Sequence, residues 1–139
     1  MIWFNDRFHK NQKGQTLVEF ALILPIIIII LFGITEFGRI FYSYLVITNA
    51  ARQGARYGAV VETVRKTNEE IRQKVREVLP DSIKIPNDDD ISIEPKEKDA
   101  RIPGVPLRVE VTYKVDLITP IVLGKDTITL KSKAVMRVE

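Results

Sequence analysis

Hydrophobic and polar positions fall into three successive patterns along the 139-residue chain. In the first, residues 17–34 are almost all apolar. As a helix with a rise of about 1.5 Å per residue they would measure roughly 27 Å, close to the thickness of a bilayer core. This pattern predicts a transmembrane helix over residues 15–35.

The second pattern keeps helical spacing after the span, as at Tyr44 and Ile47. We expect an extended amphipathic helical region over residues 36–79. Thr67 and Glu70 have the spacing of a capping box, so we expect a break near Thr67 and a second, short helix that ends at Leu79.

Small residues recur along this helical region and would let another backbone approach closely. The candidate helix-packing positions are Gly33, Gly38, Gly54 and Gly58, and a basic ridge is formed by Arg39, Arg52 and Arg56. Two interpretations stay open, packing against another subunit and packing against the chain's own domain, and we favour the second.

In the third pattern, after Pro80, apolar and polar residues alternate as in β-strands. Two short runs, 82–85 and 91–94, predict edge strands. Strict alternation over residues 107–117 predicts a long strand, with Leu107 and Val109 on its apolar face. A turn over residues 119–126 and a last strand over 127–138 should complete an antiparallel pair.

A half-apolar sheet must bury one face, and the nearest amphipathic cover is the helix that continues from the membrane. We therefore predict an α+β fold. A long N-terminal transmembrane helix continues into an outer domain, in which a helix packs on a small antiparallel sheet built from residues 80–139.

Charges flanking the span predict its orientation. Arg7, His9, Lys10 and Lys13 precede it, and Asp6 is the sole acid among the first fourteen residues. The positive-inside rule makes residues 1–14 a basic cytoplasmic leader and places the remainder outside the cytoplasm. A secretory signal would have a shorter apolar core and a small-residue cleavage site, so we favour a retained single-pass anchor.

Composition argues against several classes of function. The chain has no cysteine, which excludes disulfides and thiolate chemistry, and its net charge of +3 comes from interspersed residues, so nucleic-acid binding is not indicated. His9, the single histidine, precedes the span. Asp88–Asp90 lacks the glycine and distal glutamate of a calcium loop. We expect no enzymatic activity, catalytic residue, metal or cofactor.

Glu19 is a carboxylate inside the apolar run, where such a group costs up to about 3 kcal/mol. If the chain were cut after Gly14, Gln15 would carry a free amine at a helix start, where the helix dipole disfavours positive charge. Glu19 would lie one turn away and could offset this amine or that of a neighbouring copy. The alternative is a carboxylate that reaches the headgroups and has no assembly role.

Pro25 lies within the predicted span. Its ring removes one helical hydrogen bond and opposes the carbonyl of Ala21, so we expect a kink or local melting there.

Gly14, followed after four residues by Glu19 and Phe20, resembles a type IV prepilin processing site. More narrowly, the chain resembles the TadE-like pseudopilins of the tight-adherence (Flp) pilus system. The similar segments are residues 19–25 (EFALILP), 32–34 (FGI), 36–39 (EFGR) and 49–57 (NAARQGARY). Beyond about Gly58 only the closing residues 134–137 and the strand pattern resemble the family.

The resemblance implies a minor pilin-like subunit of a type IVb pilus or a related secretion apparatus. Gly14 and Gln15 would be the pair cut by a prepilin peptidase, and Glu19 with Phe20 would act in recognition and assembly. Its partners would be that peptidase, other pilins and pseudopilins, the Tad inner-membrane assembly platform and membrane lipid. TadG-like relatives usually carry a larger outer region, whereas TadF-like members are closer in size. The alternative function is a membrane-tethered binding module that is never processed.

Overall fold

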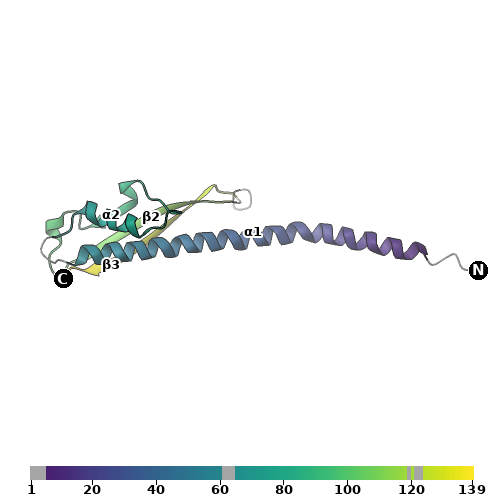
Figure 1. The fold of residues 1–139 in the computed structure, drawn as a ribbon, viewed down its shortest axis with the longest axis horizontal. Coiled ribbons are helices and arrows are strands. Elements are labelled where there is room, and N and C mark those ends of the chain that lie inside the picture. Colours follow the sequence, from purple (N-terminus) through teal and green to yellow (C-terminus); the bar gives the residue numbers. More distant parts are fainter. Residues whose placement is uncertain (1–5, 61–64, 119, 121–123) are drawn as a thin grey trace, which may run out of the picture. The chain divides into compact units, whose positions relative to one another are not determined.

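A computed structural model describes residues 6–60, 65–118, 120 and 124–139, with side chains from Gly14 onward (Figure 1). The main elements are helices α1 (Asp6–Ala59) and α2 (Asn68–Val78) and strands β1 (Ile91–Glu94), β2 (Pro106–Asp116) and β3 (Thr127–Arg137). Two short 3-10 turns, Asp88–Asp90 and Lys98–Ala100, flank β1. The predicted α+β class, with a long apolar N-terminal helix and a small antiparallel sheet, is confirmed.

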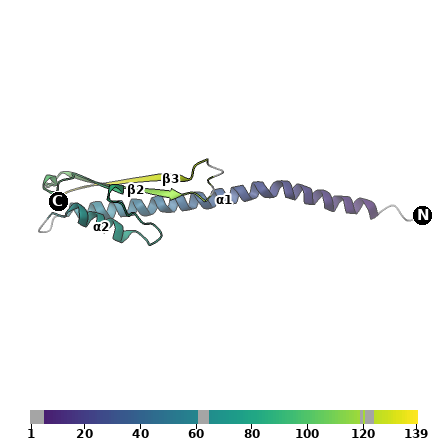
Figure 2. The same cartoon turned by 90° about the horizontal axis from the view of Figure 1, so that it is seen from above.

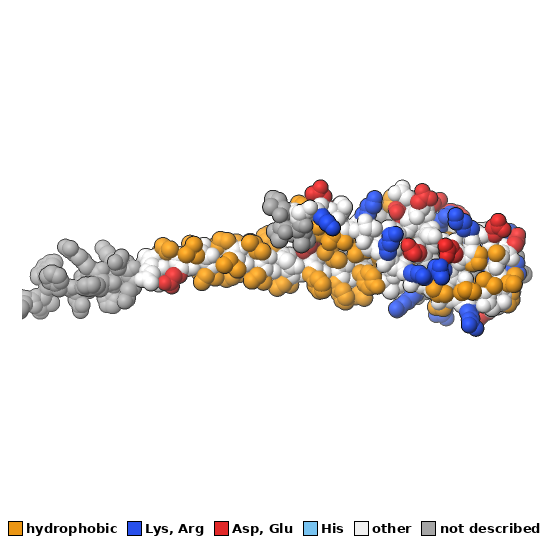
Figure 3. All heavy atoms as spheres, turned by 180° about the vertical axis from the view of Figure 1, so that it is seen from behind, with side chains coloured by type: hydrophobic (Ala, Val, Ile, Leu, Met, Phe, Trp, Pro, Cys, Tyr) orange, Lys and Arg blue, Asp and Glu red, His pale blue; other side chains and the backbone are white. Residues whose placement is uncertain are grey.

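The chain forms two compact units, Met1–Gly38 and Arg39–Glu139. In the first, the apolar side chains of α1 are exposed (Figure 3). Leu22 and Ile34, for example, are 69% and 64% exposed. The helix from Gly14 to Ala59 is long and apolar enough to cross a membrane, and none of its most apolar stretch is buried. A helix of this kind fits a single-pass membrane protein.

α1 continues through Pro25 without a break in its helical assignment. Local melting at this proline is therefore not observed, and the kink stays a prediction. α1 ends at Ala59, eight residues before the predicted break at Thr67, and residues 61–64 of this interval lie outside the described part of the chain. Val60 begins a run of β-branched residues, which form helices less readily than the preceding alanines and arginines.

α2 begins as predicted. Thr67 is its N-cap, with its hydroxyl accepting from the Glu70 amide at 3.2 Å and its own amide donating to the Glu70 carboxylate at 2.6 Å. These reciprocal bonds satisfy two amides that the first helical turn leaves without intrahelical partners. The backbone hydrogen bond from Thr67, followed by that of its hydroxyl, holds the pKa of Glu70 below its usual value.

The three strands form one antiparallel sheet in the order β1-β2-β3, seen from two directions in Figures 1 and 2. Val109 pairs with Ile93 on one side and with Ala134 on the other. β1 is thus an edge strand, as predicted, and β2 and β3 agree with their predicted bounds to within one residue. The apolar face of β2 is also correct, because Leu107, Val109 and Val111 are fully buried.

The predicted strand over residues 82–85 is wrong. This segment forms a turn followed by irregular chain, although Ile83 and Ile85 are buried and their neighbours exposed. The Ile85 carbonyl accepts from the Arg76 side chain at 3.1 Å. The alternation correctly marked which residues are buried, but in the structure this segment pairs with no strand.

The core of the second unit lies where α1, α2 and the sheet meet. Ile71 and Val75 of α2 are fully buried, and burial of one such side chain contributes about 1.5–3 kcal/mol. A Cβ added to Gly54 would collide with a methyl of Val75, and one added to Gly58 would lie 2.7 Å from a methyl of Leu107. Small residues on α1 therefore allow α2 and β2 to approach it closely.

Candidate processing and assembly site

The predicted scissile pair lies within α1, since the helix begins at Asp6 and runs through Gly14. Among the described residues, nothing lies within 4 Å of the point where a Cβ of Gly14 would be. A peptidase that binds extended chain would have to open this turn. Glycine weakens a helix by about 1 kcal/mol relative to alanine, which makes opening easier here.

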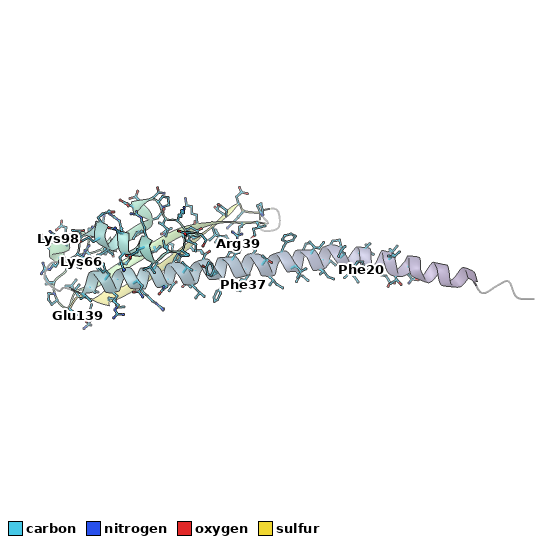
Figure 4. All side chains as sticks on the ribbon, viewed as in Figure 1. Phe20, Phe37, Arg39, Lys66, Lys98 and Glu139 are labelled. Atoms are coloured by element: carbon cyan, nitrogen blue, oxygen red, sulfur yellow. The ribbon has the colours of Figure 1, made fainter. Side chains whose placement is uncertain are left out.

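Gln15 and Glu19 are joined by a side-chain hydrogen bond of 3.0 Å, from the Gln15 amide to one Glu19 carboxylate oxygen. The two residues are one turn apart on the same face of α1, as their spacing predicts. The Glu19 carboxylate is thus directed toward Gln15, which would become the first residue of the helix after a cut at Gly14. In the uncut chain its hydrogen-bond donor is the neutral Gln15 side-chain amide. Phe20, the next residue, projects from α1 with 57% of its surface exposed (Figure 4).

Gly33 and Gly38 have open surroundings in the part of the chain that the structure describes, because a Cβ at either position would meet nothing there within 4 Å. They differ in this from Gly54 and Gly58, which lie in the core. The four glycines that the sequence grouped together therefore have two environments. Gly33 and Gly38 leave space on the surface of α1, where the backbone of another helix could approach.

Beyond Arg39, α1 keeps an exposed apolar surface although its other face is in the core. The exposed residues include Phe41 (51%), Tyr42, Tyr44 and Leu45 (51%). Such aromatic and aliphatic side chains are normally covered by lipid or protein when they lie together.

A scan against protein-family models matches residues 14–56 to the family described as TadE-like protein. This segment is TadE-like. The match confirms the resemblance drawn from the motifs, and it covers the glycine, the carboxylate and most of α1. No curated protein and no solved structure matches the chain.

TadE-like proteins form a structural family associated with the Tad pilus. The TadE-like segment of this chain ends within α1, so residues 57–139, which include α2 and the whole sheet, lie outside the match.

Among the described residues, polar contacts join the TadE-like segment to the sheet. The Arg39 guanidinium donates to the Asp116 carbonyl at 3.2 Å, and the Ser132 hydroxyl donates to that of Thr48 at 2.8 Å. Because Asp116 ends β2, Arg39 marks the level of α1 at which the β2–β3 hairpin begins its turn. Of the predicted basic ridge, Arg52 and Arg56 are exposed, whereas Arg39 is half-buried and has this partner.

Sequence reasoning missed Arg101, which is 1% exposed. Its guanidinium donates to the Pro95 carbonyl at 3.0 and 3.1 Å, to the Lys66 carbonyl at 2.8 Å and to the Asn68 amide oxygen. Desolvation by burial lowers its pKa below the usual value. The arginine ties the loop after β1 to the start of α2. Its local sequence, a basic residue before a Pro-Gly turn, gave no signal of burial.

Glu36 is a second buried charged residue that the sequence marked only as part of a motif; it is 3% exposed and has interaction partners.

Among the described residues, no three histidines, aspartates or glutamates come together in a way that could hold a metal ion. The Asp88 carboxylate instead pairs with Arg76, whose hydrogen bond lowers the pKa of Asp88. A hollow of about 330 Å³ beside Arg39, Tyr42 and Tyr113 presents no histidine or paired carboxylates.

Proposed function

We propose that this protein is a minor pilin-like subunit that supports assembly of a tight-adherence (Flp) type IVb pilus or a related secretion apparatus. The observation that carries the proposal is the match of residues 14–56 to the TadE-like family, in a chain whose Gly14 lies five residues before a carboxylate in an apolar helix. The subunit has a structural role.

In this mechanism the apolar part of α1 holds the subunit in the cytoplasmic membrane, with residues 1–14 in the cytoplasm and the sheet domain outside. A prepilin peptidase cuts between Gly14 and Gln15. The new amine then lies at the start of the same helical face as Glu19, whose carboxylate already accepts a hydrogen bond from the Gln15 side chain. Cleavage thus adds a charged donor beside the neutral side-chain donor that Glu19 already has.

An ammonium and a carboxylate about 4 Å apart attract each other by about 4 kcal/mol at an effective dielectric constant of about 20. This attraction is large enough to offset a good part of the unfavourable position of each charge, the amine at a helix start and the carboxylate in lipid. If the amine belongs to a neighbouring subunit, the same attraction fixes the register of the added helix. Open space at Gly33 and Gly38 supports close lateral packing of helices, and the Tad inner-membrane platform and other pilins are the expected partners.

Mass spectrometry of the intact protein, extracted from membranes of cells with an active prepilin peptidase, tests the proposal. We expect a mass that begins at Gln15. Gly14→Leu is the matched control, because a Cβ added there meets none of the described residues within 4 Å and leucine is a good helix former, so a retained leader would reflect blocked cleavage and not misfolding. An intact Met1 terminus in the wild-type chain would contradict the proposal and favour the membrane-tethered module that is never processed.

A further inference from the structure

β3 forms a long and regular edge of the sheet. Among the described residues it pairs only with β2, and its register runs without a bulge along all eleven residues. The strand contains no proline or glycine, whereas β1, at the opposite edge, has only four residues. Proteins usually shorten, bulge or cover an edge strand, because its outer amides and carbonyls can pair with another chain. β3 shows none of these three features over its length.

Hydrogen bonds beyond the two ends of β3 show which of its backbone groups point outward. The Leu117 amide donates to the Asp126 carbonyl at 2.9 Å, and the Val138 amide donates to the Val105 carbonyl at 3.0 Å. Both pairs continue the β2–β3 register, in which alternate residues exchange bonds with the partner strand. Even-numbered residues of β3 therefore bond to β2. The residues that direct their amides and carbonyls to the outer edge are Thr127, Thr129, Lys131, Lys133, Val135 and Arg137.

The outer edge has a partner just after β3. Glu139 continues the odd-numbered series and donates its amide to the Ala59 carbonyl at 3.1 Å. In the part of the chain that the structure describes, no such partner is found for the outward amides from Thr129 to Val135. These groups are therefore available to an added strand.

α1 provides a surface beside this edge. It meets β2 at Gly58 and β3 at Thr48, whose hydroxyl accepts from Ser132 at 2.8 Å. Further round the helix in the same direction lie Leu45, which is 51% exposed, and Arg52, which is also exposed. Alternate side chains of a strand added to β3 would lie on the Leu45 side and could cover it.

Two lysines on the outer face of β3 restrict what can pair with it. Lys131 and Lys133 are both exposed. In antiparallel pairing with a second copy of β3, full overlap would set Lys131 opposite Lys133, and a shift of two residues would set one of the lysines opposite itself. Like charges directly opposite destabilise a strand pair, whereas opposite charges stabilise it. The edge therefore disfavours pairing with its own copy and favours carboxylates at alternate positions.

We propose that the β3 edge binds an extended segment of a different protein by strand addition, and that this segment carries two carboxylates separated by one residue. The added strand runs antiparallel to β3, which is the more stable pairing. Its backbone bonds to the outward groups of Thr129, Lys131 and Lys133, and its carboxylates face the two lysines. The residue between them is apolar, because it projects toward the side of Leu45. The inference uses only residues of the unit Arg39–Glu139 and is independent of cleavage after Gly14.

Two synthetic peptides test the proposal with the full-length protein in phospholipid nanodiscs. One alternates valine with glutamate, the other alternates valine with lysine, and both are long enough to cover Thr127–Val135. NMR of the isotope-labelled protein would follow amide exchange, which slows when an amide gains a stable hydrogen bond. An added strand should slow exchange at Thr129, Lys131 and Lys133 and leave Ser132, whose amide points to β2, unchanged.

We expect this slowing with the valine–glutamate peptide, and an affinity roughly tenfold above that of the valine–lysine peptide. Lys131→Glu should remove the preference, because one lysine and one glutamate would then face the peptide. Lys131 suits this reversal, since it lies opposite Thr112 of β2 whereas Lys133 lies opposite Glu110. Lys84→Glu, the same charge change in an exposed loop, is the matched control and should keep the preference.

Thr129→Pro tests the backbone contribution. Proline removes one outward amide and no bond to β2, which edge strands tolerate. We expect weaker peptide binding with unchanged thermal unfolding, and binding as tight as that of the wild-type chain would contradict strand addition.

Unchanged exchange at the three outward amides, or equal affinity for the two peptides, would overturn the proposal. So would outward amides that exchange slowly without peptide when each nanodisc holds two copies, because the edge would then be paired between copies of this chain. Protein that keeps Met1 and protein that begins at Gln15 should bind alike, which separates this test from that of the proposed function.

Discussion

At the scale of single residues, Arg101 shows how much depends on one buried side chain. Three of its acceptors, at Pro95, Lys66 and Asn68, are neutral oxygens from separate segments of the chain. The arginine side chain therefore holds the loop after β1 against the start of α2 by hydrogen bonds, where no backbone hydrogen bonds of a strand or helix are described between them.

We expect Arg101→Met to lower the free energy of unfolding by about 2–4 kcal/mol, because the apolar part of the side chain is kept while several buried acceptors lose their donor. Denaturant titration of the detergent-solubilised chain would measure this. Arg52→Met, which replaces an exposed arginine, should change stability by less than about 0.5 kcal/mol. Equal effects of the two substitutions would show that the Arg101 network contributes nothing.

At the scale of elements, the sequence signals were most reliable where local chemistry decides the structure. The Thr67 and Glu70 capping box located the start of α2, and alternation located β2 and β3. Alternation failed over residues 82–85, since a strand needs a partner to receive its hydrogen bonds and this requirement cannot be seen in the segment itself. The end of α1 was also predicted too late.

The capping box makes the stability of α2 depend on pH. Because the pKa of Glu70 is lower in the folded chain, its contribution is present above the unfolded value of about 4.3 and is lost as pH falls through the folded value. We expect a shallower loss of stability over this acidic range in Glu70→Ala, and an intermediate slope in Thr67→Ala, which keeps the backbone donor. Unfolding titrations at several pH values would measure the slopes.

Asp88, whose pKa is lowered by Arg76, contributes in the same direction and is unchanged in both variants. The comparison therefore isolates Glu70. Identical slopes for the wild-type chain and Glu70→Ala would contradict the role given to the capping box.

At the scale of the whole molecule, Glu19 has its proposed consequence between subunits. We expect Glu19→Ala to leave cleavage after Gly14 largely intact and to reduce incorporation into assemblies, because the freed amine would lose its counter-charge. Glu19→Gln should behave similarly, whereas Val18→Ala, in the same turn, keeps the charge and should assemble normally. Mass spectrometry would report cleavage, and electron microscopy with quantification of the subunit in sheared filaments would report assembly.

Normal piliation in both Glu19 variants would contradict charge pairing. That result would favour the simpler interpretation, in which the carboxylate reaches the headgroups and plays no part in assembly.

The sequence by itself determined the membrane-length apolar helix, the fold class, the strand faces and the TadE-like motifs, because these depend on spacing and composition along a continuous segment. Only the tertiary structure decided that Gly54 and Gly58 lie in the core while Gly33 and Gly38 stay open. It also decided that residues 82–85 pair with none of the described strands and that the end of β2 lies level with Arg39. These outcomes depend on which distant segments come together, and no local pattern records that information.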